Sequence, residues 1–196
     1  MSTQAPPWFS ALAPEVRLLG ASALLAERPV ALVGSRRCPG AILLAAADWA
    51  DEWVSRAAQR PVLAGGFQTP VEQEVLRRLI RGGAPVVVFP ARRLPRRLPP
   101  DQKAAVDGGT LTFASPFTNA RATLAVAQAR NNLLRTQTRA AIVLYADPGS
   151  QTMAWVMSMI DKGVPVSVLD HDANGELIAA GARPFTFETG YEPFHS

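Results

Sequence analysis

The sequence predicts an α/β fold of the doubly wound type, in which a mostly parallel sheet of about six strands forms a single domain. Two observations lead to this prediction. Apolar runs rich in β-branched residues recur along the chain, and most segments between them carry apolar residues at the three- and four-residue spacing of amphipathic helices. The runs are apolar throughout rather than alternating, which is typical of strands that are buried between two layers of helices.

The predicted strands follow turn residues. Pro29, Pro61, Pro85 and Pro165 begin four of them, at a position where the missing N–H costs little. A further short strand is expected at the edge of the sheet, over residues 184–188. The six buried strands are predicted over residues 29–34, 61–65, 85–89, 110–114, 140–145 and 165–169.

Helices are predicted between most of these strands, over residues 40–58, 70–81, 120–135 and 151–162. Thr69 before Pro70 predicts a capped helix start, and Gly82 and Gly163 are typical of helix ends. Trp49 and Trp53 lie one turn apart among alanines and are expected in the core. Residues 91–100 are predicted to form a basic loop stiffened by prolines.

The chain divides into a lead-in over residues 1–28, the main domain over 29–170 and a C-terminal extension over 171–196. The longest apolar run, residues 41–47, is much shorter than the about 20 residues of a membrane span. Residues 1–8 lack the pattern of a secretory signal. A single cysteine, Cys38, excludes a disulfide scaffold. We expect a cytoplasmic protein with no membrane partner.

Positive charge is concentrated in the first three-quarters of the chain. Residues 1–146 carry 18 basic and 9 acidic side chains, whereas residues 147–196 carry 2 and 7. All but two of the basic residues are arginines, which suit bidentate contact with phosphate. This pattern fits nucleic acid, a nucleotide or another polyanion. A GC-rich genome can produce the same arginine bias, so charge alone does not identify the ligand.

Four loops leave the predicted carboxyl ends of the strands, where open parallel sheets bind their ligands. They carry glycines that permit close backbone approach, hydroxyls and helix N-termini that can donate to phosphate, and arginines. We predict that they converge on one anion-binding cleft. The loop candidates are Gly34, Ser35, Arg36, Arg37, Gly65, Gly66, Gly149, Ser150 and Thr152, with Arg92, Arg93, Arg96 and Arg97 as a secondary basic track.

Other chemistries lack their defining residues. Neither Gly-x-Gly-x-x-Gly after the first strand nor a P-loop motif is present, which argues against the usual dinucleotide and P-loop sites. His171 and His195 are the only histidines and both come late, so no metal site, cofactor or histidine-based triad is expected. Glu72 and Glu74 are interpreted as residues that interact favourably with the dipole of their helix rather than as catalytic acids or bases.

Several segments, taken in order, resemble one known family. They are the strand that ends in Gly-Ser-Arg (30–36), the Gly-Gly turn (62–66), the strand end at 113–116, the pair Arg130 and Asn131, and the Gly-Ser turn (149–152). Over about residues 16–170 this order resembles the Rossmann-like domain of the DprA (Smf) DNA-processing family.

The resemblance implies a Rossmann-like fold and single-stranded DNA binding without catalysis. It also implies a protein that pairs with itself as a homodimer and hands DNA to a RecA-type recombinase. By the same resemblance, Arg130 and Asn131 join the candidates for contact with phosphate. Because Phe67 and Phe117 are the main aromatic residues of the loops, we expect modest base stacking and little sequence preference.

Two alternatives remain open. The segment 67–73 departs from the DprA pattern, and the winged-helix domain that many members add is not expected in this chain. The site is therefore also interpreted as a possible sensor pocket for a small nucleotide-derived ligand. The related LOG phosphoribohydrolases carry the motif Pro-Gly-Gly-x-Gly-Thr-x-x-Glu. The corresponding segment of this chain, residues 148–155, lacks the glutamate of that motif. Hydrolysis is the less favoured alternative.

Overall fold

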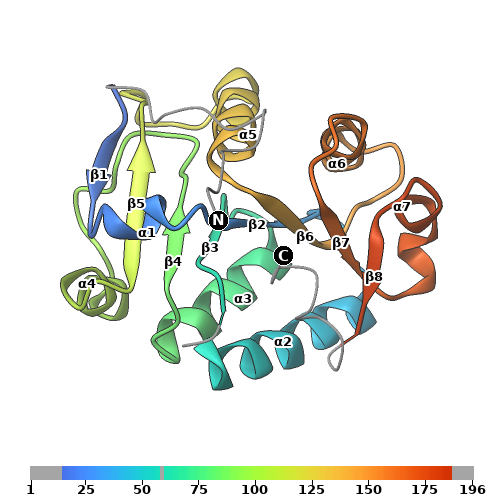
Figure 1. Cartoon of the computed structure of the whole chain (residues 1–196). Helices are drawn as coiled ribbons and strands as arrows, with labels where there is room; N and C mark the ends of the chain where they lie inside the picture. Colours follow the sequence, from blue (N-terminus) through green and yellow to red (C-terminus); the bar gives the residue numbers. More distant parts are fainter. Residues whose placement is uncertain (1–14, 58–59, 187–196) are drawn as a thin grey trace, which may run out of the picture.

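The computed structural model describes residues 15–57 and 60–186. One eight-stranded sheet runs through this part of the chain in the order β1-β5-β4-β3-β2-β6-β7-β8 (Figure 1). All neighbouring strands are parallel except the pair β1 and β5. The strands are β1 (Arg17–Leu19), β2 (Val30–Gly34), β3 (Leu63–Gly65), β4 (Val86–Val88), β5 (Leu111–Ser115), β6 (Ala140–Tyr145), β7 (Val166–Leu169) and β8 (Arg183–Phe185).

The predicted α/β class and the six inner strands, β2 to β7, are confirmed. Two edge strands complete the sheet. The antiparallel strand β1 comes from the lead-in and was not predicted. The edge strand expected over 184–188 is present as β8, and residues 187–188 lie outside the described residues. Strand order reverses between β2 and β6, which is the position where open α/β sheets bind ligands.

Helices cover both faces of the sheet (Figure 1). Helices α2, α3 and α4 pack on one face, and α1, α5, α6 and α7 pack on the other. Trp49 and Trp53 are in the core as predicted, with ring centroids 4.9 Å apart. The helices are α1 (Ala23–Ala26), α2 (Gly40–Ser55), α3 (Pro70–Arg81), α4 (Pro100–Asp107), α5 (Leu124–Gln137), α6 (Gln151–Asp161) and α7 (Gly175–Ala179), and the 3-10 helix η2 spans Asp172–Asn174.

The four predicted helices are present, with differences at their ends. Helix α2 ends at Ser55 rather than 58, and α5 begins at Leu124, where the Thr123 hydroxyl accepts a hydrogen bond from the Val126 N–H. Helix α4 was not predicted. It buries only Ala105, so its apolar periodicity is weak, although Pro100 at its start and Gly108 at its end are usual boundary residues.

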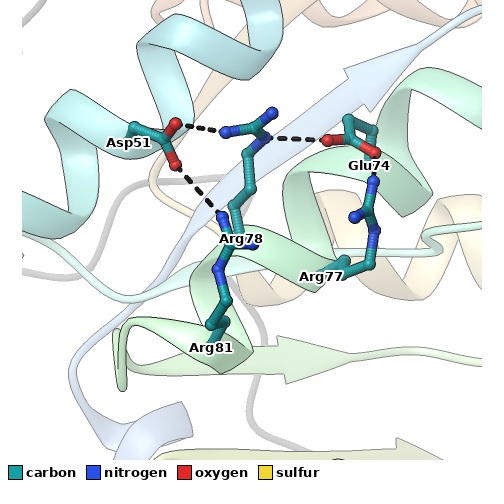
Figure 2. Close-up of polar contacts among 5 residues, drawn as sticks. All are labelled: Asp51, Glu74, Arg77, Arg78 and Arg81. Atoms are coloured by element: carbon teal, nitrogen blue, oxygen red, sulfur yellow. Dashed lines mark hydrogen bonds and ion pairs between the residues drawn. The ribbon is translucent and has the colours of Figure 1, made fainter.

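Ion pairs join α2 to α3 on the face away from α5 and α6 (Figures 1 and 2). Arg78 of α3 bonds Glu74 with an Nε to Oε1 distance of 2.8 Å and also pairs with Asp51 of α2. Arg77 pairs with Glu74, and Arg81 lies 3.8 Å from Asp51. Each of the three arginines of α3 therefore lies within ion-pair distance of a carboxylate. None of the described helices is long and apolar enough to cross a membrane.

Candidate functional site: two joined pockets at the carboxyl ends of the strands

A pocket of about 240 Å³ lies where β2 and β3 end and where α3, α5 and α6 meet. We call it the central pocket. Helices α5 and α6 stand on the same side of the sheet (Figure 1), and residues of both line this pocket. The structure thus brings together candidates from four separate segments. The predicted site residues that line it are Gly34, Arg36, Gly66, Arg130, Asn131 and Thr152.

A larger pocket of about 530 Å³ adjoins the central pocket. We call it the basic pocket, because Arg36, Arg92 and Arg97 line it and none of its described lining residues is acidic. Phe67 and Phe113 contribute apolar surface to it. Arg36, Gly66 and Gln68 line both pockets, so the two form one continuous depression.

The two central arginines differ in exposure. Arg36 is exposed and has no carboxylate partner among the described residues. Arg130 is only 9% exposed, and its Nη1 donates a hydrogen bond of 3.3 Å to the Phe89 carbonyl. Its buried Nε has no hydrogen-bond partner among the residues that the structure describes. Burial lowers the pKa of Arg130, and the nearby Glu72 carboxylate opposes that change. A buried, incompletely bonded guanidinium can still donate to a bound anion.

Gly66 makes room for this guanidinium. A Cβ at Gly66 would lie 1.3 Å from Nη1 of Arg130, which no side chain can tolerate without displacing the arginine. The glycine was predicted as a place where phosphate approaches the backbone. In the structure, the group that approaches most closely is Arg130. The next residue, Phe67, has a φ of 49°, a left-handed conformation that is rare for aromatic residues and that tends to occur at functional sites.

The Glu72 carboxylate accepts hydrogen bonds from backbone N–H groups around the central pocket. Its Oε1 accepts a hydrogen bond of 2.9 Å from the Gly34 N–H, and its Oε2 accepts from the N–H groups of Gln68 and Thr69. With the Thr69 hydroxyl it forms a capping box at the start of α3, which confirms the structural interpretation. Burial raises the pKa of the Glu72 carboxyl, while these N–H groups and the charge of Arg130 oppose the rise.

The backbone N–H groups at the end of β2 are hydrogen-bonded to other parts of the protein. The Gly34 N–H donates to Glu72, and the Ser35 N–H donates to the Tyr145 carbonyl over 2.9 Å. The Ser35 hydroxyl accepts a hydrogen bond of 2.9 Å from the Asp147 N–H, and its Oγ lies 3.5 Å from the Oγ of Ser150. These contacts join β2 to α3 and β6, so the N–H groups of Gly34 and Ser35 are already hydrogen-bonded within the protein.

The N-terminus of α6 keeps unsatisfied donors beside the central pocket. The Ser150 hydroxyl caps the helix by accepting from the Met153 N–H, but the first two helical N–H groups, at Gln151 and Thr152, have no intrahelical acceptor. Gly149 has a φ of 71° and lets the chain turn into the helix. The dipole and donors at this end of α6 favour an anion.

Several candidates do not line either pocket. Arg37 is exposed beyond the pockets, and Gly65 is packed in β3, where a Cβ would lie 3.0 Å from the Leu32 carbonyl. The others are Ser35, Arg93, Arg96, Gly149 and Ser150. Sequence reasoning also missed Gln68, Gln73 and Gln102, which line the basic pocket. No motif marks them, and Gln102 lies on the unpredicted helix α4.

Within residues 15–57 and 60–186, no group of three or more histidine, cysteine, aspartate or glutamate side chains is placed to hold a metal ion. The two pockets present arginine side chains, the N-terminal N–H groups of α6 and side-chain amides to a ligand. Such groups bind anions and polar ligands by charge and hydrogen bonding.

Comparisons with known proteins agree with this architecture. No protein-family model matches the sequence, and no curated protein matches it either. Among solved structures, DNA processing protein A (DprA) from Streptococcus pneumoniae has a TM-score of 0.72 at 19% identity, over 92% of this chain and 67% of that one. DprA from Helicobacter pylori, in a structure that describes its single-stranded DNA binding mode, has a TM-score of 0.71 at 19% identity, over 94% of this chain and 90% of that one.

The molybdenum cofactor binding protein from Rippkaea orientalis is a more distant match. Its TM-score is 0.57 at 16% identity, over 83% of this chain and 92% of that one. The two DprA structures match a larger share of this chain and with higher TM-scores than this protein does. The fold of this chain is DprA-like.

Proposed function

We propose that this protein binds single-stranded DNA through backbone phosphates, without catalysis, along the depression formed by the basic and central pockets. The observation that carries the proposal is the position of Arg36, which lines both pockets and has no carboxylate partner among the described residues. One exposed guanidinium at the junction can contact a strand that passes from one pocket to the other. The H. pylori neighbour, whose structure describes single-stranded DNA binding, supports the same class of ligand.

The charges along this path favour a polyanion over a single small anion. Arg92 and Arg97 lie at one end, Arg36 lies at the junction, and Arg130 with the N-terminus of α6 lies at the other. Several separated cationic sites match a ligand that carries several phosphates. Each phosphate that is neutralised releases counterions, so the affinity should fall steeply as salt is raised.

The test compares oligonucleotide binding by two charge-matched variants. Fluorescence anisotropy with a labelled single-stranded oligonucleotide is measured for the wild type, for Arg36→Ala with Arg97→Ala, and for Lys162→Ala with Arg183→Ala. Both variants lose two positive charges. Lys162 and Arg183 are exposed, lie outside both pockets, and belong to the end of α6 and the edge strand β8.

We expect the pocket variant to lose at least about 100-fold in affinity, because two charged hydrogen-bonded contacts with phosphate, each worth about 1.5 kcal/mol or more, are removed. Its slope of log affinity against log salt should become shallower by about 1.4, at roughly 0.7 for each lost phosphate contact. The control variant should keep the wild-type slope. Equal affinities and slopes in the two variants would contradict the proposed path.

A small nucleotide-derived ligand in the central pocket is the alternative. Titration calorimetry with mononucleotides discriminates between the two, since micromolar binding of a mononucleotide without binding of an oligonucleotide selects the sensor function. The hydrolase alternative needs a carboxylate that is available to the substrate. The carboxylate of Glu72 already accepts three backbone hydrogen bonds, which argues against that use.

The resemblance to DprA proteins also leads us to propose a homodimer that passes its strand to a RecA-type recombinase in the cytoplasm. Sedimentation at several protein concentrations tests the dimer. Pull-down of a purified recombinase of this type, with and without single-stranded DNA, tests the partner. A monomer at all concentrations, or no capture in either condition, would remove the corresponding part of the proposal.

A further inference from the structure

We propose that the groove between α5 and α6 receives nucleobases of the bound strand and contacts them through side-chain amides. This inference rests on the proposed function and assigns a separate surface to the bases. The groove has a volume of about 400 Å³ and contains no charged residue among those that line it. We call it the amide groove, and its lining residues are Gln128, Asn131, Asn132, Gln151, Ala154 and Trp155.

The composition of this groove is unusual for this chain. The sequence contains twelve asparagines and glutamines, and four of them meet here. Gln128, Asn131 and Asn132 are spaced by three and four residues, so they share one face of α5. Gln151 begins α6, and Trp155 follows one turn later on that helix. Two consecutive helices, joined through β6, thus present amides to the same space.

The four side-chain amides are available to a ligand. Within the described part of the chain, none of them makes a hydrogen bond with another protein group. Trp155 is half-buried, and its indole nitrogen is turned into the protein, where it has no partner. What Trp155 presents to the groove is therefore carbon rather than an N–H group.

The amide groove continues directly from the central pocket. Asn131, Gln151 and Trp155 line both. A phosphate held by Arg130 and the N-terminus of α6 would therefore have its nucleoside at the mouth of the groove. The charged part of the ligand meets arginine and helix donors, and its uncharged part meets amides and an aromatic ring.

The chemistry of the groove fits nucleobases and disfavours phosphate. Each carboxamide carries both a donor and an acceptor and can rotate to exchange them, so it can pair with the edges of different bases. Single-stranded nucleic acids are recognised through such exposed edges and through contact of bases with aromatic rings. Because the amides adapt, we expect contacts that depend on the presence of a base and only weakly on its identity.

The first test separates base contacts from phosphate contacts. Affinities are measured for a thymidine oligonucleotide and for an abasic oligomer of the same length, which keeps the phosphates and lacks the bases. The variant is Gln128→Ala with Asn132→Ala, both exposed and neutral. The control is Asn119→Ala, which removes an exposed amide outside the pockets and the groove.

We expect the groove variant to bind the thymidine oligonucleotide about tenfold more weakly, as the loss of two hydrogen bonds implies, and to keep its affinity for the abasic oligomer. The salt dependence should not change, since no charge is removed. An equal loss for both oligomers, or no loss for either, would overturn the inference while leaving the phosphate path intact. If the wild type binds neither oligomer, the proposed function fails and the inference fails with it.

The second test uses tryptophan fluorescence in a Trp8→Phe background, because Trp8 lies outside the described residues. Trp49 and Trp53 are 2% and 1% exposed, so a ligand in the groove should affect Trp155 rather than these two. We expect the thymidine oligonucleotide to quench emission and the abasic oligomer to leave it unchanged. The difference should vanish in Trp155→Phe. Quenching that persists in this variant, or that the abasic oligomer also produces, would contradict base binding beside Trp155.

Discussion

Replacing Gly66 with alanine should displace Arg130 from its place in the central pocket. The new Cβ would lie 1.3 Å from Nη1 and 2.3 Å from Cζ of Arg130, so the guanidinium must move. The φ of Gly66 is not in the left-handed region, so the backbone itself accepts alanine. The substitution therefore acts on Arg130 rather than on the local conformation of the chain.

The expected cost follows from the contacts that Arg130 would lose. Its hydrogen bond to the Phe89 carbonyl joins a charged donor to a buried acceptor, and such a bond is worth about 1.5–3 kcal/mol. We expect Gly66→Ala to lower the free energy of unfolding by about 2 kcal/mol. When Arg130 is already alanine the clash no longer exists, so Gly66→Ala should then cost less than about 0.5 kcal/mol.

The assay is a double-mutant cycle with four proteins: the wild type, Gly66→Ala, Arg130→Ala and the double variant. Unfolding in urea gives the midpoint and slope for each. A coupling free energy of about 2 kcal/mol between the two sites is the expected result. Costs that simply add in the double variant would refute the reasoning, because they would mean that the two residues do not compete for the same space.

Three further predictions concern neighbouring contacts. Ser35→Ala should lower the free energy of unfolding by about 1–3 kcal/mol in urea, because it leaves the Asp147 N–H without its acceptor, and it should leave the salt dependence of DNA binding unchanged. Arg78→Ala should cost about 1 kcal/mol or less in a thermal melt, and less still at high salt, because its ion pairs are only partly buried. The cost of Arg130→Ala should grow as the pH rises above the ordinary pKa of a glutamate. Removing Arg130 takes away a charge that opposes the rise in the pKa of the Glu72 carboxyl, and stability is lost as pH rises through that raised pKa. Urea unfolding at several pH values measures this, and a cost that is flat or falls with pH would contradict it.

The inner sheet could be predicted from the sequence because its signal is local. Each buried strand is a short apolar run after a turn residue, and α3 has a threonine cap, a proline and a terminal glycine in the expected places. Helix α4 lacked that signal, since it buries only Ala105. The antiparallel strand β1 was not predicted either, because its three residues form a strand only by pairing with β5, about a hundred residues away in the sequence.

The candidate site could be predicted only in part, for a similar reason. Loops at the carboxyl ends of parallel strands must meet at one edge, so the convergence of Arg36, Gly66 and Thr152 follows from the fold class. Which atoms face the ligand depends on partners that are distant in sequence. The N–H of Gly34 donates to the Glu72 carboxylate, and the hydroxyl of Ser35 accepts from the Asp147 N–H. No local sequence pattern reveals either contact.

Arg36 and Arg130 differ in burial, so we expect them to have different roles, although no local sequence pattern distinguishes them. Arg36 is exposed, so its removal should leave the stability of the fold unchanged and take away one phosphate contact, which a shallower salt dependence would report. Arg130 is packed against Gly66 and bonded to Phe89, so its removal also reshapes the pocket. If both arginines only supplied charge, Arg36→Ala and Arg130→Ala would shift the salt dependence equally and leave stability alone. A loss of stability confined to Arg130→Ala would instead identify that guanidinium as part of the pocket wall.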